Sequence, residues 1–277
     1  METSPSKQAV QVALLDLGER LEVNKINIEY LARKLNSLQS SFAFTIVPPI
    51  TLATIGDPSI EDDRNIWYEF EPMFDVLRRH DCFAHYSYVI GITHLCMTER
   101  DTDSGKNWGD YFSLSDKEKV AVISVNQNVL KYNSPSKNVY QYLSTLIVSE
   151  LLIMLCKKDL IHTKSNYCLF DDCVDRSLFG RCIELGEICE ECRSELKRCN
   201  IGNKVITDVL TVLEWCKSKS MKYSTVAALS HPLTLLAFGG ILGWFGSAFV
   251  APGHYLAALC PLLVPVLVFV YVRYLSR

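Results

Sequence analysis

The residues best able to do chemistry in this chain are cysteines that gather between residues 168 and 199. Cys189 and Cys192 form a Cys-x-x-Cys pair, and two thiolates at this spacing can bind one Zn²⁺ at about 2.3 Å each. A structural zinc site needs two further Cys or His ligands. The predicted ligands are Cys168, Cys173, Cys189 and Cys192, and the substitutes for one of them are His162 and Cys182.

The same cysteines have two other interpretations. Cysteine is also a small buried hydrophobic residue, so core packing is an alternative explanation of the cluster. A redox-active pair is the weaker alternative, because the sequence does not place Cys189 at the start of a helix after a strand. Nearby Glu187, Glu190 and Glu191 also disfavour a reactive thiolate. We therefore expect a structural zinc ion.

The composition narrows the class of protein. The chain has 277 residues, of which 49% are hydrophobic and 21% charged, and its net charge of -3 provides no basic face for nucleic acid. The N-terminal segment carries Asp16, Glu19 and Glu22 where a secretory signal needs an apolar run. Because thiols that are not exported stay reduced, we expect metal binding or burial rather than disulfides.

Hydrophobic periodicity indicates the elements that must position these cysteines. Helical patterns cover residues 16–38, 67–80, 139–156 and 203–217, and runs of strand character cover 42–49, 85–97 and 119–128. The run 139–156 is apolar on more than one face, which predicts a buried central helix that contains Glu150. Residues 1–220 are thus predicted to form a soluble α+β or α/β domain with a small mixed sheet and a Cys-rich, zinc-binding segment at 162–199.

The C-terminal part of the chain predicts a membrane hairpin. Residues 233–250 and 255–272 are charge-free runs of 18 residues each, close to the length that crosses a hydrocarbon core of about 30 Å. Residues 221–277 are therefore expected to form an all-α transmembrane hairpin with spans at about 230–250 and 255–273. Basic residues lie at the outer ends and none in the connecting loop, so both termini are expected in the cytoplasm and the hairpin in the inner membrane. A long buried hairpin in a soluble protein is the alternative.

Small residues recur at every fourth position of the first predicted span, at Gly239, Gly243 and Ser247. This spacing lets another helix approach closely in a membrane, so these residues are the expected site of helix association. Packing against the second span of the same hairpin is an equal alternative. Neither of the runs 233–250 and 255–272 contains an acidic or basic residue, which argues against a transporter or a proton relay.

Five short pieces follow one another between residues 91 and 192. They are Gly91–Thr93 (Gly-Ile-Thr), Val122–Ser124 (Val-Ile-Ser), the helix around Ser149 and Glu150, Cys168–Phe170, and Cys189–Cys192, which is separated from Phe170 by a gap of 18 residues. In order and spacing these pieces resemble the archaemetzincin-like zinc peptidases. The resemblance covers about residues 40 to 195, and it implies the fold of that family together with its four-cysteine structural zinc site.

The catalytic motif of that family is missing from this sequence. Where the family has HExxH, the chain has Ser-Glu-Leu-Leu-Ile at residues 149–153, so both zinc-binding histidines are absent. The resemblance therefore implies a degenerate domain that keeps the structural zinc, with Cys173 in the place of an upstream family cysteine. Glu150 is then either a vestigial residue or, in the alternative, the carboxylate of a divergent metallohydrolase.

The whole layout, a cytoplasmic domain followed by two spans, resembles the two-transmembrane effectors of bacterial anti-phage systems of the retron or cyclic-nucleotide signalling type. That resemblance implies a non-catalytic effector or sensor whose domain controls a hairpin that oligomerises and disrupts the membrane. The expected partners are the lipid bilayer, other copies of the chain or a cytoplasmic protein. A membrane-anchored metallohydrolase and a passive membrane-anchored adaptor are the alternatives.

Overall fold

The computed structural model of the chain describes residues 9–18, 21, 25–56, 60–61, 66–100, 107–130, 138–158, 160–162, 167–171 and 176–217. The chain divides into two units, Met1–Lys217 and Ser218–Arg277. The second unit, with the predicted spans and the helix-association residues Gly239, Gly243 and Ser247, lies outside the described residues, as does Cys173. The architecture that follows is that of the first unit.

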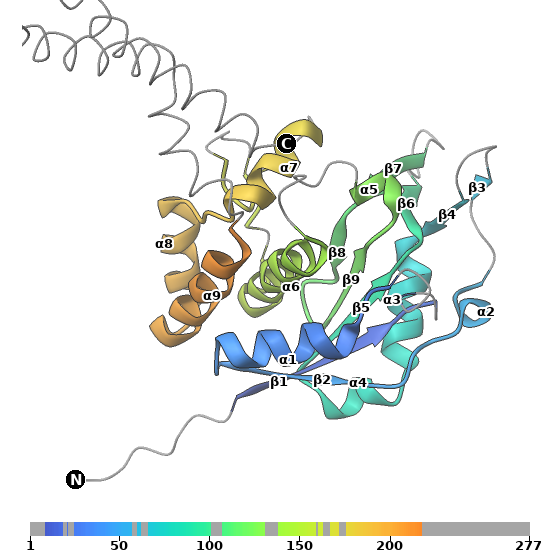
Figure 1. Cartoon of the computed structure of the whole chain (residues 1–277), viewed down its shortest axis with the longest axis horizontal. Helices are drawn as coiled ribbons and strands as arrows, with labels where there is room; N and C mark the ends of the chain where they lie inside the picture. The colour runs from blue at the N-terminus through green and yellow to red at the C-terminus, as the bar shows by residue number, and fades with distance from the viewer. Residues whose placement is uncertain are drawn as a thin grey trace, which may run out of the picture. The chain divides into compact units, whose positions relative to one another are not determined.

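A five-stranded mixed sheet forms the centre of this unit (Figure 1). Its strands lie in the order β2-β1-β5-β9-β8, with bounds Phe42–Ile46, Val10–Asp16, Tyr88–Thr93, Val120–Ser124 and Ser113–Ser115. Neighbouring strands from β2 to β9 pair in parallel, and β8 pairs antiparallel with β9. The predicted mixed sheet is confirmed, and the fold is that of a mixed α/β domain.

The central strands are buried on both faces of the sheet. Every residue of β9 is buried. In β1, Val12 and Leu14 belong to one hydrophobic core, whereas Ala13 and Leu15 belong to a second. Because successive side chains of a strand point to opposite faces, each face of the sheet has its own core and needs its own layer of helices.

Different helices supply these two layers. The first core includes residues of α1 (Ile28–Leu38), α6 (Val139–Cys156) and α9 (Asn203–Cys216). The second core includes residues of α2 (Leu52–Ile55), α3 (Phe70–Arg79) and α4 (Cys82–His85). Figure 1 shows α1 and α6 lying across the first face of the sheet. The segment with the cysteine cluster follows α6 directly and therefore belongs to this first side.

A second sheet and three short helices complete the unit. The second sheet has the strand order β3-β4-β6-β7, with bounds Ile60–Glu61, Ile66–Glu69, Cys96–Arg100 and Asn107–Tyr111. The remaining helices are α5 (Gln127–Leu130), α7 (Arg176–Leu185) and α8 (Glu190–Arg198). Since β6 begins three residues after β5 ends, the second sheet continues directly from the carboxyl end of a central strand.

The predicted buried central helix is confirmed as α6. A capping box begins it: Asn138 accepts the Gln141 N–H at 2.9 Å, and the Gln141 side chain accepts the Asn138 N–H at 3.1 Å. Lys157 ends it in the left-handed region with φ 54°. Within the described part of the chain, α6 is the one helix long and apolar enough to cross a membrane, and 78% of it is buried inside the unit, as a core helix would be.

Two of the predicted helices begin too early. The helical pattern at residues 16–38 overlaps with the end of β1. The helix α1 begins only at Ile28, where the side chain of the N-cap residue Asn27 accepts the N–H of Tyr30 at 2.8 Å. The pattern at 67–80 includes the end of β4 before α3 begins. Strands β7 and β8 lie between the predicted strand runs 85–97 and 119–128, in a mostly polar segment for which the sequence predicted no element. The predicted strand at 42–49 and the predicted helix at 203–217 are confirmed as β2 and α9.

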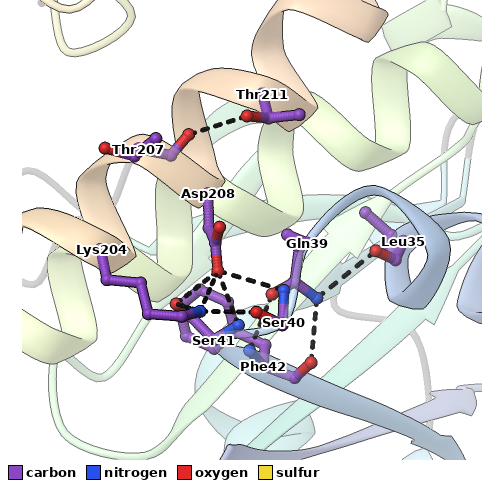
Figure 2. A network of polar contacts seen from close by, with 9 residues as sticks. All are labelled: Leu35, Gln39, Ser40, Ser41, Phe42, Lys204, Thr207, Asp208 and Thr211. Carbon is purple, nitrogen blue, oxygen red and sulfur yellow. Dashed lines mark hydrogen bonds and ion pairs between the residues drawn. The ribbon is translucent and has the colours of Figure 1, made fainter.

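A half-buried carboxylate fastens α9 to the turn between α1 and β2 (Figure 2). Asp208 accepts hydrogen bonds from the Ser40 N–H at 3.1 Å, the Ser41 N–H at 2.8 Å and the Ser41 hydroxyl at 2.6 Å. Lys204 Nζ lies 2.7 Å from the same oxygen. Burial raises the pKa of the Asp208 carboxyl, but the bonds from Lys204 and Ser41 outweigh burial and hold that pKa at about 2.

Candidate metal centre

Two short backbone pairings bring metal-binding side chains together between α6 and α8. The His162 N–H donates to the Phe170 carbonyl at 3.1 Å, and the Leu169 N–H donates to the Glu187 carbonyl at 2.7 Å. The segment 167–171 therefore lies between residue 162 on one side and residue 187 on the other. This arrangement places Cys168 beside the start of α8, where Cys189 and Cys192 lie.

Four donor atoms converge at this point. One ring nitrogen of His162 and the sulfurs of Cys168, Cys189 and Cys192 all lie within 4.8 Å of one another. The Cys168 and Cys192 sulfurs are 3.8 Å apart, and Cys189 Sγ is 3.4 Å from His162 Nε2. Around a tetrahedral zinc ion, two sulfurs lie about 3.8 Å apart, and a sulfur and a nitrogen about 3.6 Å apart. The donor set is therefore able to bind a metal, and it fits one zinc ion.

Local hydrogen bonds favour the thiolate form of Cys168. Cys189 is the N-cap of α8, and its sulfur accepts the Cys192 N–H at 3.5 Å. The sulfur of Cys168 accepts the Cys189 N–H at 3.3 Å. A hydrogen bond from the Cys192 thiol, with further bonds from the N–H groups of Cys189 and Phe170, overcomes burial and lowers the pKa of Cys168 to about 5. Thiolate is the form that binds a metal ion.

The structure brings some predicted ligands together and separates others. Cys168, Cys189 and Cys192 lie together as expected, and His162, foreseen as a substitute, supplies the fourth donor. The Cys182 sulfur is 4.0 Å from Asp171 Oδ2 and is not a member of the four-donor group. Cys173 lies outside the described residues.

The position of Cys189 is in part the one typical of a redox-active pair. Cys189 lies at the start of a helix, but it follows a loop rather than a strand, so the strand-to-helix position is absent, as the sequence predicted. The contact that favours a metal is that of Cys189 Sγ with His162 Nε2, because it adds a fourth donor of the type that zinc prefers.

The sequence also left out Asp171, which touches two of the ligands. Its Oδ1 lies 3.0 Å from His162 Nδ1, and its Oδ2 accepts the Cys168 N–H at 2.9 Å. No motif pointed to it, because Asp171 is three residues beyond Cys168 in a segment without regular periodicity. The spacing of His162 and Cys168 ahead of the Cys-x-x-Cys pair was the available signal for the histidine.

Glu150 lies in the core and is not part of the metal centre. It is 5% exposed, and its Oε1 accepts the hydroxyl of Ser113 at 2.5 Å, which joins α6 to the edge strand β8. Among the residues that the structure describes, no second group of three or more His, Cys, Asp or Glu lies close enough to hold a metal. The described part of the chain thus presents one metal centre, and Glu150 lies outside it.

The two strand motifs quoted for the family resemblance lie side by side. Gly91–Thr93 forms the end of β5 and Val122–Ser124 the end of β9, and they pair residue for residue in parallel, from Gly91 with Val122 to Thr93 with Ser124. Glu150 lies on α6, which packs against β9 on the first face of the central sheet. The pieces are therefore arranged around one part of the central sheet.

Comparison with known proteins gives one match among solved structures. No family model matches the sequence, and no curated protein matches it. The chain is similar to the crystal structure of archaemetzincin from Methanopyrus kandleri, with a TM-score of 0.47 and 15% sequence identity over 72% of this chain and 99% of that chain. This structure belongs to the family that the sequence pieces resemble.

Proposed function

We propose that the chain is a membrane-anchored, non-catalytic effector or sensor, in which a zinc-stabilised α/β domain controls a two-helix hairpin in the inner membrane. The zinc ion stabilises the segment between α6 and α9. The chain then continues from α9 into the predicted spans. In this proposal the domain receives a signal, and the hairpin acts on the bilayer.

The observation that carries the proposal is the complete set of four protein donors. A catalytic zinc site keeps one position for water or substrate, whereas a structural site fills all four with side chains. Here three sulfurs and one imidazole make up the four, and Cys168 and Cys192 are 1% and 3% exposed. A zinc ion with these ligands has no position left for a substrate, so its role is to hold the fold together.

The position of Glu150 supports a non-catalytic domain. A general base in a zinc hydrolase must reach a water bound to the metal. Glu150 is 5% exposed, is not one of the four donors, and bonds to the hydroxyl of Ser113. A carboxylate held in this way stabilises the contact of α6 with β8.

The membrane part of the proposal rests on the sequence. Two charge-free runs of 18 residues suit a hairpin, and Gly239, Gly243 and Ser247 suit association of helices. The partners proposed are therefore the lipid bilayer, other copies of the chain and a cytoplasmic protein that delivers the trigger. Disruption of the inner membrane as a defence against phage is the process that this layout suits best.

A membrane-anchored metallohydrolase is the second candidate, and one observation favours it. Glu150 is an ionisable group kept within an apolar core, and such groups are often found at functional sites because burial is otherwise costly. In this alternative Glu150 acts as the base at a second metal, whose ligands lie outside the described residues.

Inducible expression in bacteria distinguishes these functions. Five forms are compared by growth and membrane potential: the full chain, a chain that ends at Lys217, the Gly239→Leu plus Gly243→Leu variant, Glu150→Gln, and a chain in which the hairpin is exchanged for an unrelated one. We expect the full chain and Glu150→Gln to depolarise the membrane, because the hairpin needs no catalytic carboxylate. The truncated and glycine-substituted forms are expected to leave growth and membrane potential unchanged.

Each other outcome has a definite meaning. Loss of activity in a folded Glu150→Gln variant would favour the metallohydrolase. Activity that persists after the hairpin is exchanged for an unrelated one would favour a passive adaptor. Depolarisation by none of the forms, even at high expression, would contradict a hairpin that acts on the membrane without its trigger.

A further inference from the structure

We infer that Asp171 is a positioning residue of the metal centre, which orients His162 so that Nε2 faces the metal. The inference rests on the zinc site of the proposed function and goes beyond it, because Asp171 is not itself a ligand. Its side chain is 5% exposed, and its Oδ1 lies 3.0 Å from Nδ1 of the imidazole as an ion-pair contact. Three contacts made by its two oxygens carry the argument.

The first contact determines which ring nitrogen of His162 is free to bind. A neutral imidazole carries one N–H, and a carboxylate beside one nitrogen favours the proton on that nitrogen. Asp171 Oδ1 lies 3.0 Å from Nδ1, while Nε2 lies 3.4 Å from the sulfur of Cys189. The proton therefore belongs on Nδ1, and the lone pair of Nε2 points toward the other three donors.

The second contact extends the effect of Asp171 to a cysteine ligand. Its Oδ2 accepts the backbone N–H of Cys168 at 2.9 Å, and the Asp171 N–H donates to the Cys168 carbonyl at 3.1 Å. These two bonds close a tight turn over residues 168–171. One carboxylate thus fixes the ring of His162 and the backbone of Cys168 at the same time.

The third contact explains why Cys182 is buried next to the site without belonging to it. The Cys182 sulfur lies 4.0 Å from Asp171 Oδ2, at the range of a weak S–H donor. A buried carboxylate is costly unless donors surround it. Here the imidazole, the Cys168 N–H and the Cys182 thiol all face it, so the polar neighbours of Asp171 compensate for its burial.

Zinc affinity of the purified full chain tests this inference through a cycle of variants. Asp171→Ala is compared with the original chain, and His162→Ala plus Asp171→Ala is compared with His162→Ala, by competition with a chromophoric zinc chelator. Loss of a carboxylate that orients a ligand weakens metal binding by about 10- to 100-fold. We expect that loss in the first comparison, and about threefold or less in the second, because Asp171 acts mainly through His162.

Two further variants sharpen the test. Asp171→Asn keeps an oxygen acceptor for the imidazole N–H, and it should lose less affinity than Asp171→Ala. Asp208→Asn, which changes a half-buried carboxylate outside the site, should leave zinc affinity unchanged. Cobalt in place of zinc provides a second readout, because its visible spectrum reports whether nitrogen remains bound in each variant.

The outcomes separate this inference from the proposed function. If Asp171→Ala binds zinc as tightly as the original chain, or costs the same affinity with and without His162, the positioning role is overturned. If the original chain binds no metal, the site itself is overturned. A second metal bound through oxygen would contradict the non-catalytic function while leaving the Asp171 comparison readable.

Discussion

Glu150 and Ser113 show how a polar pair can belong to a core without belonging to an active site. A buried carboxylate is destabilising unless polar neighbours compensate it. The Ser113 hydroxyl, 2.5 Å from Oε1, is one such neighbour and connects β8 to α6. At the scale of single residues, this bond gives Glu150 a structural role in a helix that has no zinc-binding histidines.

Replacement of Ser113 by alanine measures that role. We expect the free energy of unfolding to fall by about 1–3 kcal/mol, because a buried acceptor loses a hydrogen bond. Chemical denaturation of the full chain in detergent, followed through the signal of the α/β domain, provides the measurement. Ser115→Ala, two residues along the same strand, is the matched control and should change stability by about 0.5 kcal/mol or less. Equal losses from both variants would show that the Glu150 contact is not important.

The metal ligands were partly predictable from single residues. Cys189 and Cys192 could be predicted as ligands because the Cys-x-x-Cys spacing is local and allows both sulfurs to bind one tetrahedral ion. The choice between Cys173 and His162 was not evident, because it depends on how segment 167–171 pairs with its neighbours. Asp171 was missed for the same reason, since its role depends on contacts rather than spacing.

At the scale of elements, the Asp208 network is the contact that joins α9 to the rest of the domain by charge (Figure 2). Asp208→Asn should lower the free energy of unfolding at neutral pH by about 2 kcal/mol, because the folded carboxyl has a pKa of about 2 against 3.8 for its ordinary value. Asp75→Ala is the control, since its ion pairs with Arg78 and Arg79 are half exposed and contribute about 0–1 kcal/mol.

The pH dependence of stability gives this network a second test. A depressed pKa means that the unfolded chain binds the proton more readily, so the contribution of Asp208 is complete above about pH 4 and is lost as pH falls toward 2. The difference in stability between the original chain and Asp208→Asn should therefore shrink over that interval. A difference that stays constant from pH 7 to pH 2 would contradict the assigned pKa.

Helices and strands could be predicted where the hydrophobic residues of a segment follow one clear pattern. The run 139–156 could be identified as a buried helix because it is too long for a strand and apolar almost all round. β1 was missed because a strand covered on both faces has no alternation, and its end ran into the helical pattern that follows. Strands β7 and β8 were missed because the segment between residues 97 and 119 is mostly polar and has no hydrophobic period from which strands could be predicted.

At the scale of the whole molecule, the chain divides into two units after Lys217. The first unit has a complete core on both faces of its sheet, and one closed metal centre among its described residues. The second unit contains both charge-free runs of the sequence. We therefore expect the two units to have different roles. The first unit is proposed to bind the zinc ion and receive the signal, and the second unit is proposed to act in the bilayer.

We propose that the chain binds one zinc ion through three sulfurs and one nitrogen and that this ion stabilises the fold. Metal analysis combined with X-ray absorption at the zinc edge of the purified full chain tests this claim most directly. The account predicts one zinc per chain, with three Zn–S contacts of about 2.3 Å and one Zn–N contact of about 2.0–2.1 Å. Two metals per chain, or a zinc ion with oxygen ligands, would contradict it and favour a metallohydrolase.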